Sequence, residues 1–148
     1  MKLVKSSILN TTPEKIFLQL QKPSRLQEVA SPILRFEFVN VKKLPKNWKI
    51  GKKYILNLYL FMHLYVGKHS IIIKKIDYKK KQIFSDESGL LAKIWNHKIY
   101  VNKYTNNKTH YTDEVEIHAG ILTLFVWIFA YFFYSHRQKK WKKLAEQL

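Results

Sequence analysis

Asp113 is the residue of this chain most suited to chemistry. Within the segment 109–118 it alternates with Tyr111, Val115 and Ile117. Alternation with a period of two places these side chains on one face of a strand, and the apolar members indicate that this face points inward. A buried carboxylate is costly unless it is paired. Asp113 is therefore interpreted either as a general base or ligand-orienting group, or as a structural residue hydrogen-bonded to a neighbouring Tyr or His.

His97 is the second candidate, because it shares a predicted strand face with Trp95 and Ile99. An imidazole there could exchange a proton with a bound ligand, although a lone histidine on an apolar strand face is more often a hydrogen-bonded core residue. His63 has the same two interpretations. Either histidine could form a dyad with Asp113, and the sequence alone does not show which of these side chains touch.

A third set of candidates lies in the C-terminal segment, where Thr123, Val126 and Ala130 form a stripe of smaller residues at helical spacing. If this stripe faces a sheet, it either forms the floor of a pocket bordered by larger aromatic residues or packs closely against the sheet. Aromatic residues elsewhere around the same helix, such as Trp127 and Phe132, would leave an apolar surface for a homodimer contact.

Several other chemistries are excluded by the sequence. The chain has no cysteine, which removes thiolate metal sites and cysteine nucleophiles. His110, His118 and His136 do not have the spacing of a metal site, and no phosphate-binding loop, dinucleotide fingerprint or Gly-x-Ser-x-Gly motif occurs. We therefore expect no metal and no cofactor.

The candidate residues must be positioned by a strand, two short helices, a run of antiparallel strands and one long helix. The short helices begin near Thr12-Pro13 and Pro23, because proline is favoured in the first helical turn. The predicted strands are residues 2–9, 34–38, 54–65, 70–77, 82–87, 94–104 and 109–118. Strands followed by a terminal helix predict a single α+β domain over residues 1–148, in which that helix covers one sheet face.

The C-terminal helix is predicted from Gly120 to Gln147, and its apolar first half has two interpretations. The apolar run is about 16 residues, shorter than the roughly 20 that a membrane span needs. Its second half keeps an apolar stripe that includes Trp141, Leu144 and Ala145, at the spacing of a helix lying on a surface. We favour a helix packed on a sheet over a membrane anchor, and a membrane-surface or membrane-anchored role through residues 119–143 remains an alternative.

The formal net charge is +17, which raises the question of nucleic-acid binding. The excess is almost entirely lysine, whereas base and phosphate recognition favours arginine. We therefore expect no specific nucleic-acid partner and only a weak attraction to anionic membranes. The first residues have no apolar core resembling a signal peptide, which predicts a cytoplasmic location.

Several motifs resemble one known superfamily. The most similar are Trp95-x-His97, Thr109-x-Tyr111-Thr112-Asp113-Glu114-Val115 and Tyr134-x-His136-Arg137-Gln138-x-x-Trp141, with further similarity at residues 12–17, 23–26, 48–54 and 86–89. These segments resemble small bacterial members of the SRPBCC superfamily, which is START-like and includes polyketide cyclases and dehydratases. The resemblance covers the whole chain and implies a helix-grip fold. In that fold, a curved seven-stranded antiparallel sheet surrounds the C-terminal helix and encloses an apolar ligand cavity.

These observations lead to a functional hypothesis and one enzymatic alternative. The hypothesis is binding of a hydrophobic small molecule or lipid between the sheet and the C-terminal helix, and the alternative is a cyclase or dehydratase that uses His97 or Asp113 in acid–base catalysis. The predicted ligand-binding residues are Trp95, His97, Tyr111, Asp113, Thr123, Val126 and Ala130.

Overall fold

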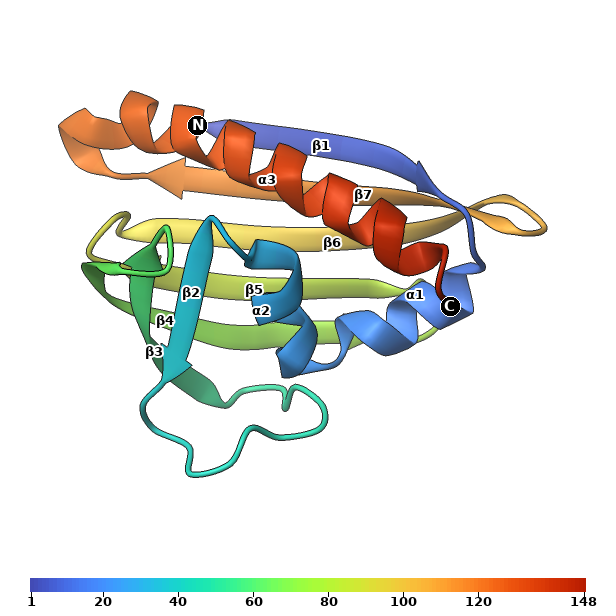
Figure 1. Ribbon diagram of the computed structural model, residues 1–148, viewed down its shortest axis with the longest axis horizontal. Helices are drawn as coiled ribbons and strands as arrows, with labels where there is room; N and C mark the ends of the chain where they lie inside the picture. The colour runs from blue at the N-terminus through green and yellow to red at the C-terminus, as the bar shows by residue number, and fades with distance from the viewer.

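The computed structural model describes residues 1–148 and contains one seven-stranded antiparallel sheet in the order β1-β7-β6-β5-β4-β3-β2 (Figure 1). The strands are β1 (Lys2–Leu9), β2 (Leu34–Phe38), β3 (Lys53–Leu60), β4 (Leu64–Asp77), β5 (Gln82–Gly89), β6 (Ile94–Thr105) and β7 (Lys108–His118). The helices are α1 (Pro13–Leu20), α2 (Pro23–Ala30), the short 3-10 helix η1 (Gly120–Leu122) and α3 (Thr123–Ala145). This arrangement confirms the predicted α+β helix-grip fold.

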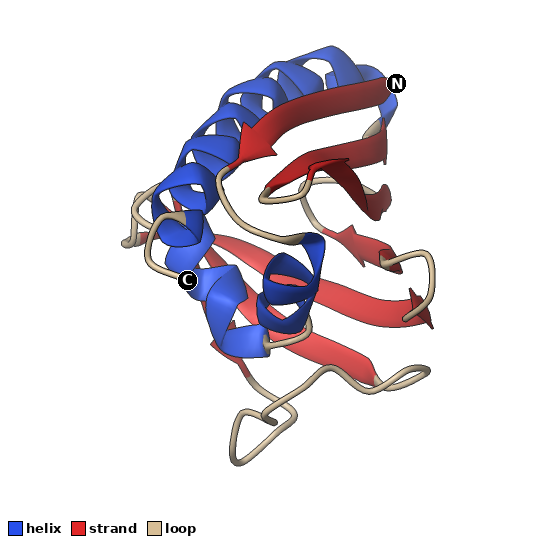
Figure 2. Ribbon diagram, turned by 90° about the vertical axis from the view of Figure 1, so that its right-hand side faces the viewer, coloured by secondary structure: helices blue, strands red, loops and turns tan.

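The sheet curves around the helices, and α3 runs along it in contact with β1, β7 and α2 (Figure 2). Each long strand alternates buried and exposed side chains; in β7, every second residue from Thr109 to Ile117 is buried. Alternation of this kind places one row of side chains on the inner face and the other in solvent. The predicted inward face of Tyr111, Asp113 and Val115 is confirmed.

The short helices begin where the sequence predicts. The hydroxyl of Thr12 accepts a hydrogen bond from the backbone N–H of Lys15, and Pro13 occupies the first turn of α1. Proline is suited to this position because its missing N–H would have no partner within the helix. The helix then buries Ile16 and Phe17 against the sheet.

One strand boundary was predicted wrongly. The interval 54–65 is not one strand: β3 ends at Leu60, the chain reverses, and β4 begins at Leu64. The reversal places Phe61 at φ 48° and Met62 at φ 73°, a left-handed conformation that is usually taken by Gly, Asn or Asp. Because neither residue type signals a turn, the periodicity predicts a continuous strand, and the predicted strands do not include residues 66–69, which belong to β4.

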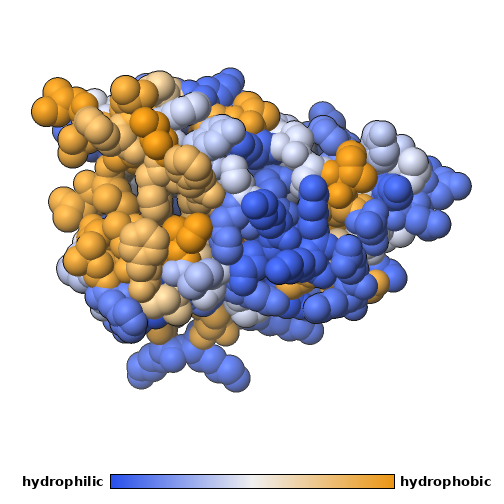
Figure 3. Space-filling view, turned by 45° about the horizontal axis from the view of Figure 1, so that its top comes forward, coloured by the Kyte–Doolittle hydropathy of each residue, from blue (hydrophilic) through white to orange (hydrophobic).

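The two halves of α3 have different surroundings. Its second half buries Phe133, Tyr134 and Trp141 against the sheet, whereas Phe125 and Phe132 in the first half are exposed. Figure 3 shows hydrophobic side chains gathered at one end of the molecule on this face. None of the helices combines the length and the apolar character that crossing a membrane requires.

Candidate functional site

A cavity lies between α3, α2 and the inner face of the sheet. It is lined by 24 residues, 17 of them hydrophobic, contributed by α1, α2, α3, the strands β2 to β6 and the adjoining loops. The space open to the centres of water-sized molecules is about 90 Å³, several times the roughly 10–15 Å³ that a single buried water occupies on this measure. No lining residue comes from β1 or β7. Strand β7, which carries Asp113 and lies between β1 and β6, is therefore behind the cavity wall.

One part of the cavity wall is polar, and it runs across three neighbouring strands. It consists of His69 on β4, Ser85 and Glu87 on β5, and His97 on β6. The sheet register brings Ser85 opposite His97 and His69 opposite Gly89, so that the four side chains share the inner face. We call this set of four residues the polar wall.

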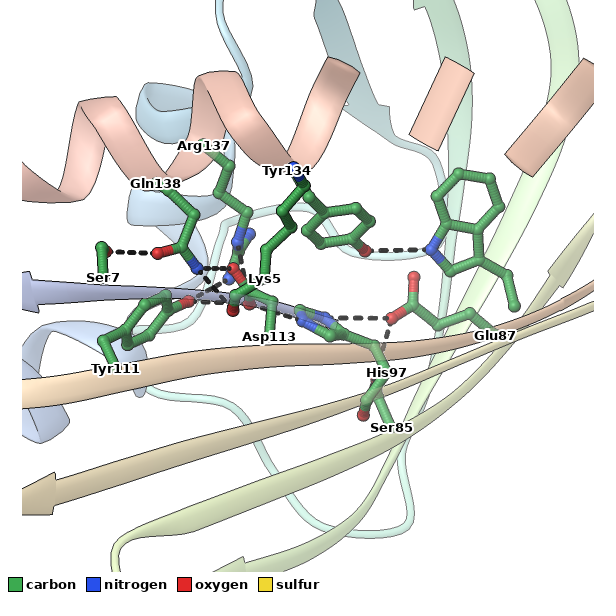
Figure 4. A network of polar contacts seen from close by, with 11 residues as sticks. Lys5, Ser7, Ser85, Glu87, His97, Tyr111, Asp113, Tyr134, Arg137 and Gln138 are labelled. Atoms are coloured by element: carbon green, nitrogen blue, oxygen red, sulfur yellow. Dashed lines mark hydrogen bonds and ion pairs between the residues drawn. The ribbon is translucent and has the colours of Figure 1, made fainter. Parts of the chain in front are cut away.

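Glu87 is the centre of the polar wall (Figure 4). One carboxylate oxygen lies 3.0 Å from Nε2 of His69. The other accepts a 2.6 Å hydrogen bond from the hydroxyl of Ser85, which Figure 4 shows. Nδ1 of His97 is 4.0 Å from the second oxygen. Burial by itself would raise the pKa of Glu87, but the hydrogen bonds and the two histidines outweigh it and leave that pKa below its ordinary value. Glu87 is therefore an ionised acceptor facing an apolar cavity at neutral pH.

Asp113 lies behind the polar wall with both carboxylate oxygens occupied (Figure 4). Oδ1 is 2.7 Å from Nε2 of His97 and accepts a 2.8 Å hydrogen bond from the Tyr111 hydroxyl, and Oδ2 accepts one of 2.8 Å from the Gln138 amide. Nε of Arg137 is 3.4 Å from Oδ1. Burial would raise the pKa of Asp113, but the charge of Arg137 and the bond from His97 lower it below its ordinary value. This geometry supports the structural interpretation of Asp113.

The contact with Asp113 also orients His97. An ionised carboxylate can only accept hydrogen bonds, so Nε2 of His97 must carry the proton in this pair. Nδ1 is then the atom that faces Glu87. The arrangement answers the question left open by the sequence: His97 and Asp113 do form a dyad, whereas His63 lies in the turn between β3 and β4.

The helix supplies the opposite side of the network. The Tyr134 hydroxyl accepts a 3.0 Å hydrogen bond from Nε1 of Trp95, and its ring lies 5.2 Å from that of His97. Arg137 donates to the Tyr111 hydroxyl at 3.3 Å. Burial would lower the pKa of Arg137, but Tyr111 and Asp113 raise it above its ordinary value, so the guanidinium stays charged. Gln138 completes the network by accepting a hydrogen bond from Ser7 on β1.

The structure separates the predicted site residues into three groups. Trp95 and His97 line the cavity, and their contact with a ligand stays a prediction. Tyr111 and Asp113 are fully buried in the network behind the wall. The stripe of Thr123, Val126 and Ala130 does not line the cavity. The residues of α3 that line it are Phe129, Phe133, Tyr134, Arg137 and Trp141.

The three stripe residues have other roles. The Thr123 hydroxyl accepts a hydrogen bond from the N–H of Ala119 and donates one to the carbonyl of Gly120, which holds the start of the helix. Val126 packs against the core with its side chain half-buried, and Ala130 is completely buried without bordering the cavity. The stripe does not line the cavity because of its position along the helix. Phe129 is the first residue of α3 that lines the cavity, and most of the stripe precedes it.

Sequence reasoning missed Glu87, His69 and Arg137. Glu87 follows Ile83 and Ser85 at intervals of two, a signal that would have placed it on the inner face. Arg137 lies three residues after Tyr134 and four before Trp141, which is the spacing of one helix face. His69 was hidden by the misplaced turn between β3 and β4.

The comparisons with known proteins support the fold. No protein-family model and no curated protein matches the chain. Among solved structures, it is similar to a START superfamily protein from Mycobacterium smegmatis, with 13% identity, a TM-score of 0.73 and coverage of 99% of this chain and 97% of the other.

Two enzymes have a similar fold. The Zhui aromatase/cyclase from Streptomyces sp. R1128 has a TM-score of 0.73 at 7% identity, covering 99% of this chain and 94% of that one. Norcoclaurine synthase from Thalictrum flavum, solved with dopamine and hydroxybenzaldehyde, has a TM-score of 0.72 at 10% identity, with coverage of 99% and 87%. The chain therefore has the START-like helix-grip fold that its motifs predicted.

Proposed function

We propose that this protein binds a hydrophobic small molecule or lipid that carries one polar group. The observation that supports this proposal is the composition of the cavity, whose largely apolar lining is interrupted by the polar wall on one side. Apolar lining favours a ligand by removing its surface from water, at about 25 cal/mol per Å², and a few convergent polar groups fix its orientation.

The polar wall also indicates which polar group would fit. Glu87 is an acceptor, so it favours a ligand hydroxyl, phenol or ammonium group that can donate a hydrogen bond. The Tyr134 hydroxyl accepts from Trp95 and keeps its own proton available for an acceptor such as a carbonyl oxygen. The solved complex of norcoclaurine synthase with dopamine and hydroxybenzaldehyde shows that one protein of this fold holds molecules of this general chemistry.

Ligand titration of the purified protein tests the proposal. Trp48, Trp95 and Trp141 line the cavity, so intrinsic fluorescence should change on addition of fatty acids, phenols or aromatic polyketide-like compounds. Native mass spectrometry of the purified protein provides an independent search for a bound molecule. No fluorescence response across the panel and no bound mass would contradict the proposal.

A pair of substitutions on β4 gives a matched control. Ile71 lines the cavity, whereas its neighbour Ile72 points to the other face and does not. Ile71→Phe should fill part of the cavity and weaken binding at least tenfold, and Ile72→Phe should leave the affinity within about twofold. Equal affinities for the two variants would place the ligand elsewhere.

Acid–base catalysis of the cyclase or dehydratase kind is the second candidate function. It is favoured by one observation: Glu87 lies between two histidines, His69 and His97, at the surface of an apolar cavity. Such a group can relay a proton to or from a bound substrate, an effect worth roughly 10²–10⁴-fold in rate.

The neighbouring carboxylate provides the control for this candidate. Glu87→Gln should reduce turnover of any substrate found by about 10²-fold or more while ligand binding is retained. Asp86→Asn removes the same charge from an exposed position and should leave turnover unchanged. If Glu87→Gln turns over substrate at the wild-type rate, the acid–base role of Glu87 is excluded.

A further inference from the structure

The first half of α3 and the preceding turn expose a continuous set of large apolar side chains. Ile121 is 97% exposed, Phe125 70% and Phe132 64%, and Leu124 and Ile128 are also exposed. No charged residue occurs between Gly120 and Tyr134. Large contiguous apolar surfaces are uncommon on monomeric proteins and mark interaction sites.

The same side of the helix becomes basic in its second half. Lys139, Lys142 and Lys143 are exposed and make no ion pair, and at 100° per residue they lie on the stripe that Phe125, Ile128 and Phe132 begin. We call this stripe, residues 121–143, the outer face of α3. It is apolar along its first part and carries exposed lysines along its second. Figure 3 shows the accompanying change from hydrophobic residues (orange) to hydrophilic residues (blue).

Apolar loops extend the first part of this face at the end of the sheet. Leu90 follows β5 and is 80% exposed, and Phe61, in the turn between β3 and β4, is 68% exposed. The register places these loops at the same end as the start of α3, because Ile94 at the start of β6 pairs with His118 at the end of β7. The apolar surface thus includes one end of the molecule.

We propose that the outer face of α3 docks on an anionic lipid bilayer. The apolar first half would lie among the headgroups and upper acyl chains, where amphipathic helices bury their apolar side by about 5–10 Å. The lysines of the second half would lie at the level of the lipid phosphates, where each is worth about a fivefold gain in affinity on a membrane rich in anionic lipid.

The charge of the protein favours a bilayer over a second copy of the chain. The formal net charge is +17, so two copies repel each other, whereas an anionic surface attracts the whole molecule and its unpaired lysines in particular. A protein partner offers no equal explanation for a stripe whose exposed side chains are apolar over three turns and whose exposed charged residues up to residue 143 are then all lysines, before the acidic Glu146 at the end of the helix. The proposal does not depend on occupancy of the cavity, which lies on the other side of α3.

Vesicle flotation with two triple variants tests the proposal. Full-length protein should float with vesicles of phosphatidylcholine containing 30% phosphatidylserine, and much less with pure phosphatidylcholine. Phe125→Gln/Ile128→Gln/Phe132→Gln should lower the partition coefficient at least tenfold at 150 mM salt. Lys139→Gln/Lys142→Gln/Lys143→Gln should lower it by up to about 100-fold.

The control removes the same charge from another part of the surface. Lys42, Lys43 and Lys46 are exposed on the loop between β2 and β3, on the side of the molecule away from α3 (Figure 1). Their combined change to glutamine should leave the partition coefficient within about threefold. If this control loses as much binding as the α3 lysine variant, or if the apolar variant binds like the wild type, the attraction is only nonspecific charge and the proposal is overturned.

A second measurement separates membrane insertion from self-association. Because the chain has no cysteine, Leu124→Cys and Lys46→Cys each provide one site for a polarity-sensitive fluorophore. Anionic vesicles should shift the emission at position 124 to the blue and leave that at position 46 unchanged. A dimer in sedimentation equilibrium that the apolar triple variant abolishes would assign the face to a second copy and overturn the proposal.

Discussion

In the first ten residues of α3, Thr123 to Phe132, only Ala130 is buried, although this half is almost entirely apolar. In the thirteen residues that follow, seven are buried, among them Arg137 and Gln138, although this half contains four lysines and one arginine. The more hydrophobic half of the helix is therefore the more exposed one.

This reversal shows that average hydropathy did not decide which half of α3 faces the sheet. The second half is held by spacing, because Tyr134, Arg137 and Trp141 recur at intervals of three and four on one side. Its buried polar groups are tolerated since Arg137 and Gln138 meet the carboxylate of Asp113. The first half has no charged residue, and its Thr123 hydroxyl and Trp127 ring N–H are hydrogen-bonded to nearby backbone groups. The membrane docking proposed above accounts for its outward apolar side chains.

The largest expected effect comes from breaking the buried ion pair. Arg137→Ala removes the cation beside Asp113 and should lower the free energy of unfolding by about 3–5 kcal/mol, because an unpaired buried charge is left behind. Urea denaturation followed by circular dichroism measures the loss. Lys139→Ala, an exposed cation on the same helix, should change the value by no more than about 0.5 kcal/mol. A similar small change for Arg137→Ala would show that the pair does not stabilise the fold.

Two adjacent phenylalanines sharpen the comparison of the two halves. Phe133 is 4% exposed and lines the cavity, whereas Phe132 is 64% exposed. Phe133→Ala should cost about 3 kcal/mol in stability, and Phe132→Ala about 0.5 kcal/mol or less. The thermal unfolding midpoints of the two variants provide the measurement. If Phe132→Ala is the more destabilising change, the outer face of α3 is part of a core and not a free surface.

The sequence was sufficient for most of the fold, because period-two alternation and proline-led helix starts are local signals. Asp113 was found in this way: its strand neighbours Tyr111 and Val115 identified the inner face. The turn at Phe61 and Met62 was not predictable, since both residues adopt positive φ without any of the residue types that favour it.

The site was less predictable than the fold. Which strand residues face the cavity depends on where the helix crosses the sheet, and no local pattern contains that information. Thr123, Val126 and Ala130 do recur at helical spacing, but the first residue of α3 that lines the cavity is Phe129. His69 and Glu87 meet because β4 and β5 pair in one particular register, a contact between residues 18 positions apart.

The pH dependence of stability tests the polar wall. The folded protein lowers the pKa of Glu87 and of Asp113 below their ordinary values of 4.5 and 3.8. Their stabilisation is therefore complete above about pH 4.5 and is lost as the pH falls through the lowered values. Glu87→Gln should reduce the free energy of unfolding by about 1 kcal/mol at pH 7, with the difference from the wild type shrinking towards pH 3. A constant difference across this range would contradict the lowered pKa of Glu87; Asp86→Asn controls for the change in net charge.

The smallest expected effect concerns the start of α3, and it distinguishes the two roles considered for Thr123. Thr123→Ala removes the hydroxyl that accepts a hydrogen bond from the N–H of Ala119 and donates one to the carbonyl of Gly120. The free energy of unfolding should fall by up to about 1 kcal/mol, the usual contribution of a hydrogen bond at the start of a helix. Because the first half of α3 is weakly packed, the loss should appear as faster hydrogen exchange in residues 119–127, with the amides of the second half unaffected. Ligand affinity should stay within about twofold of the wild type, since Thr123 does not border the cavity. A tenfold loss of affinity with unchanged exchange would instead make Thr123 a binding residue, and the part of the helix that contacts the ligand would then begin six residues before Phe129.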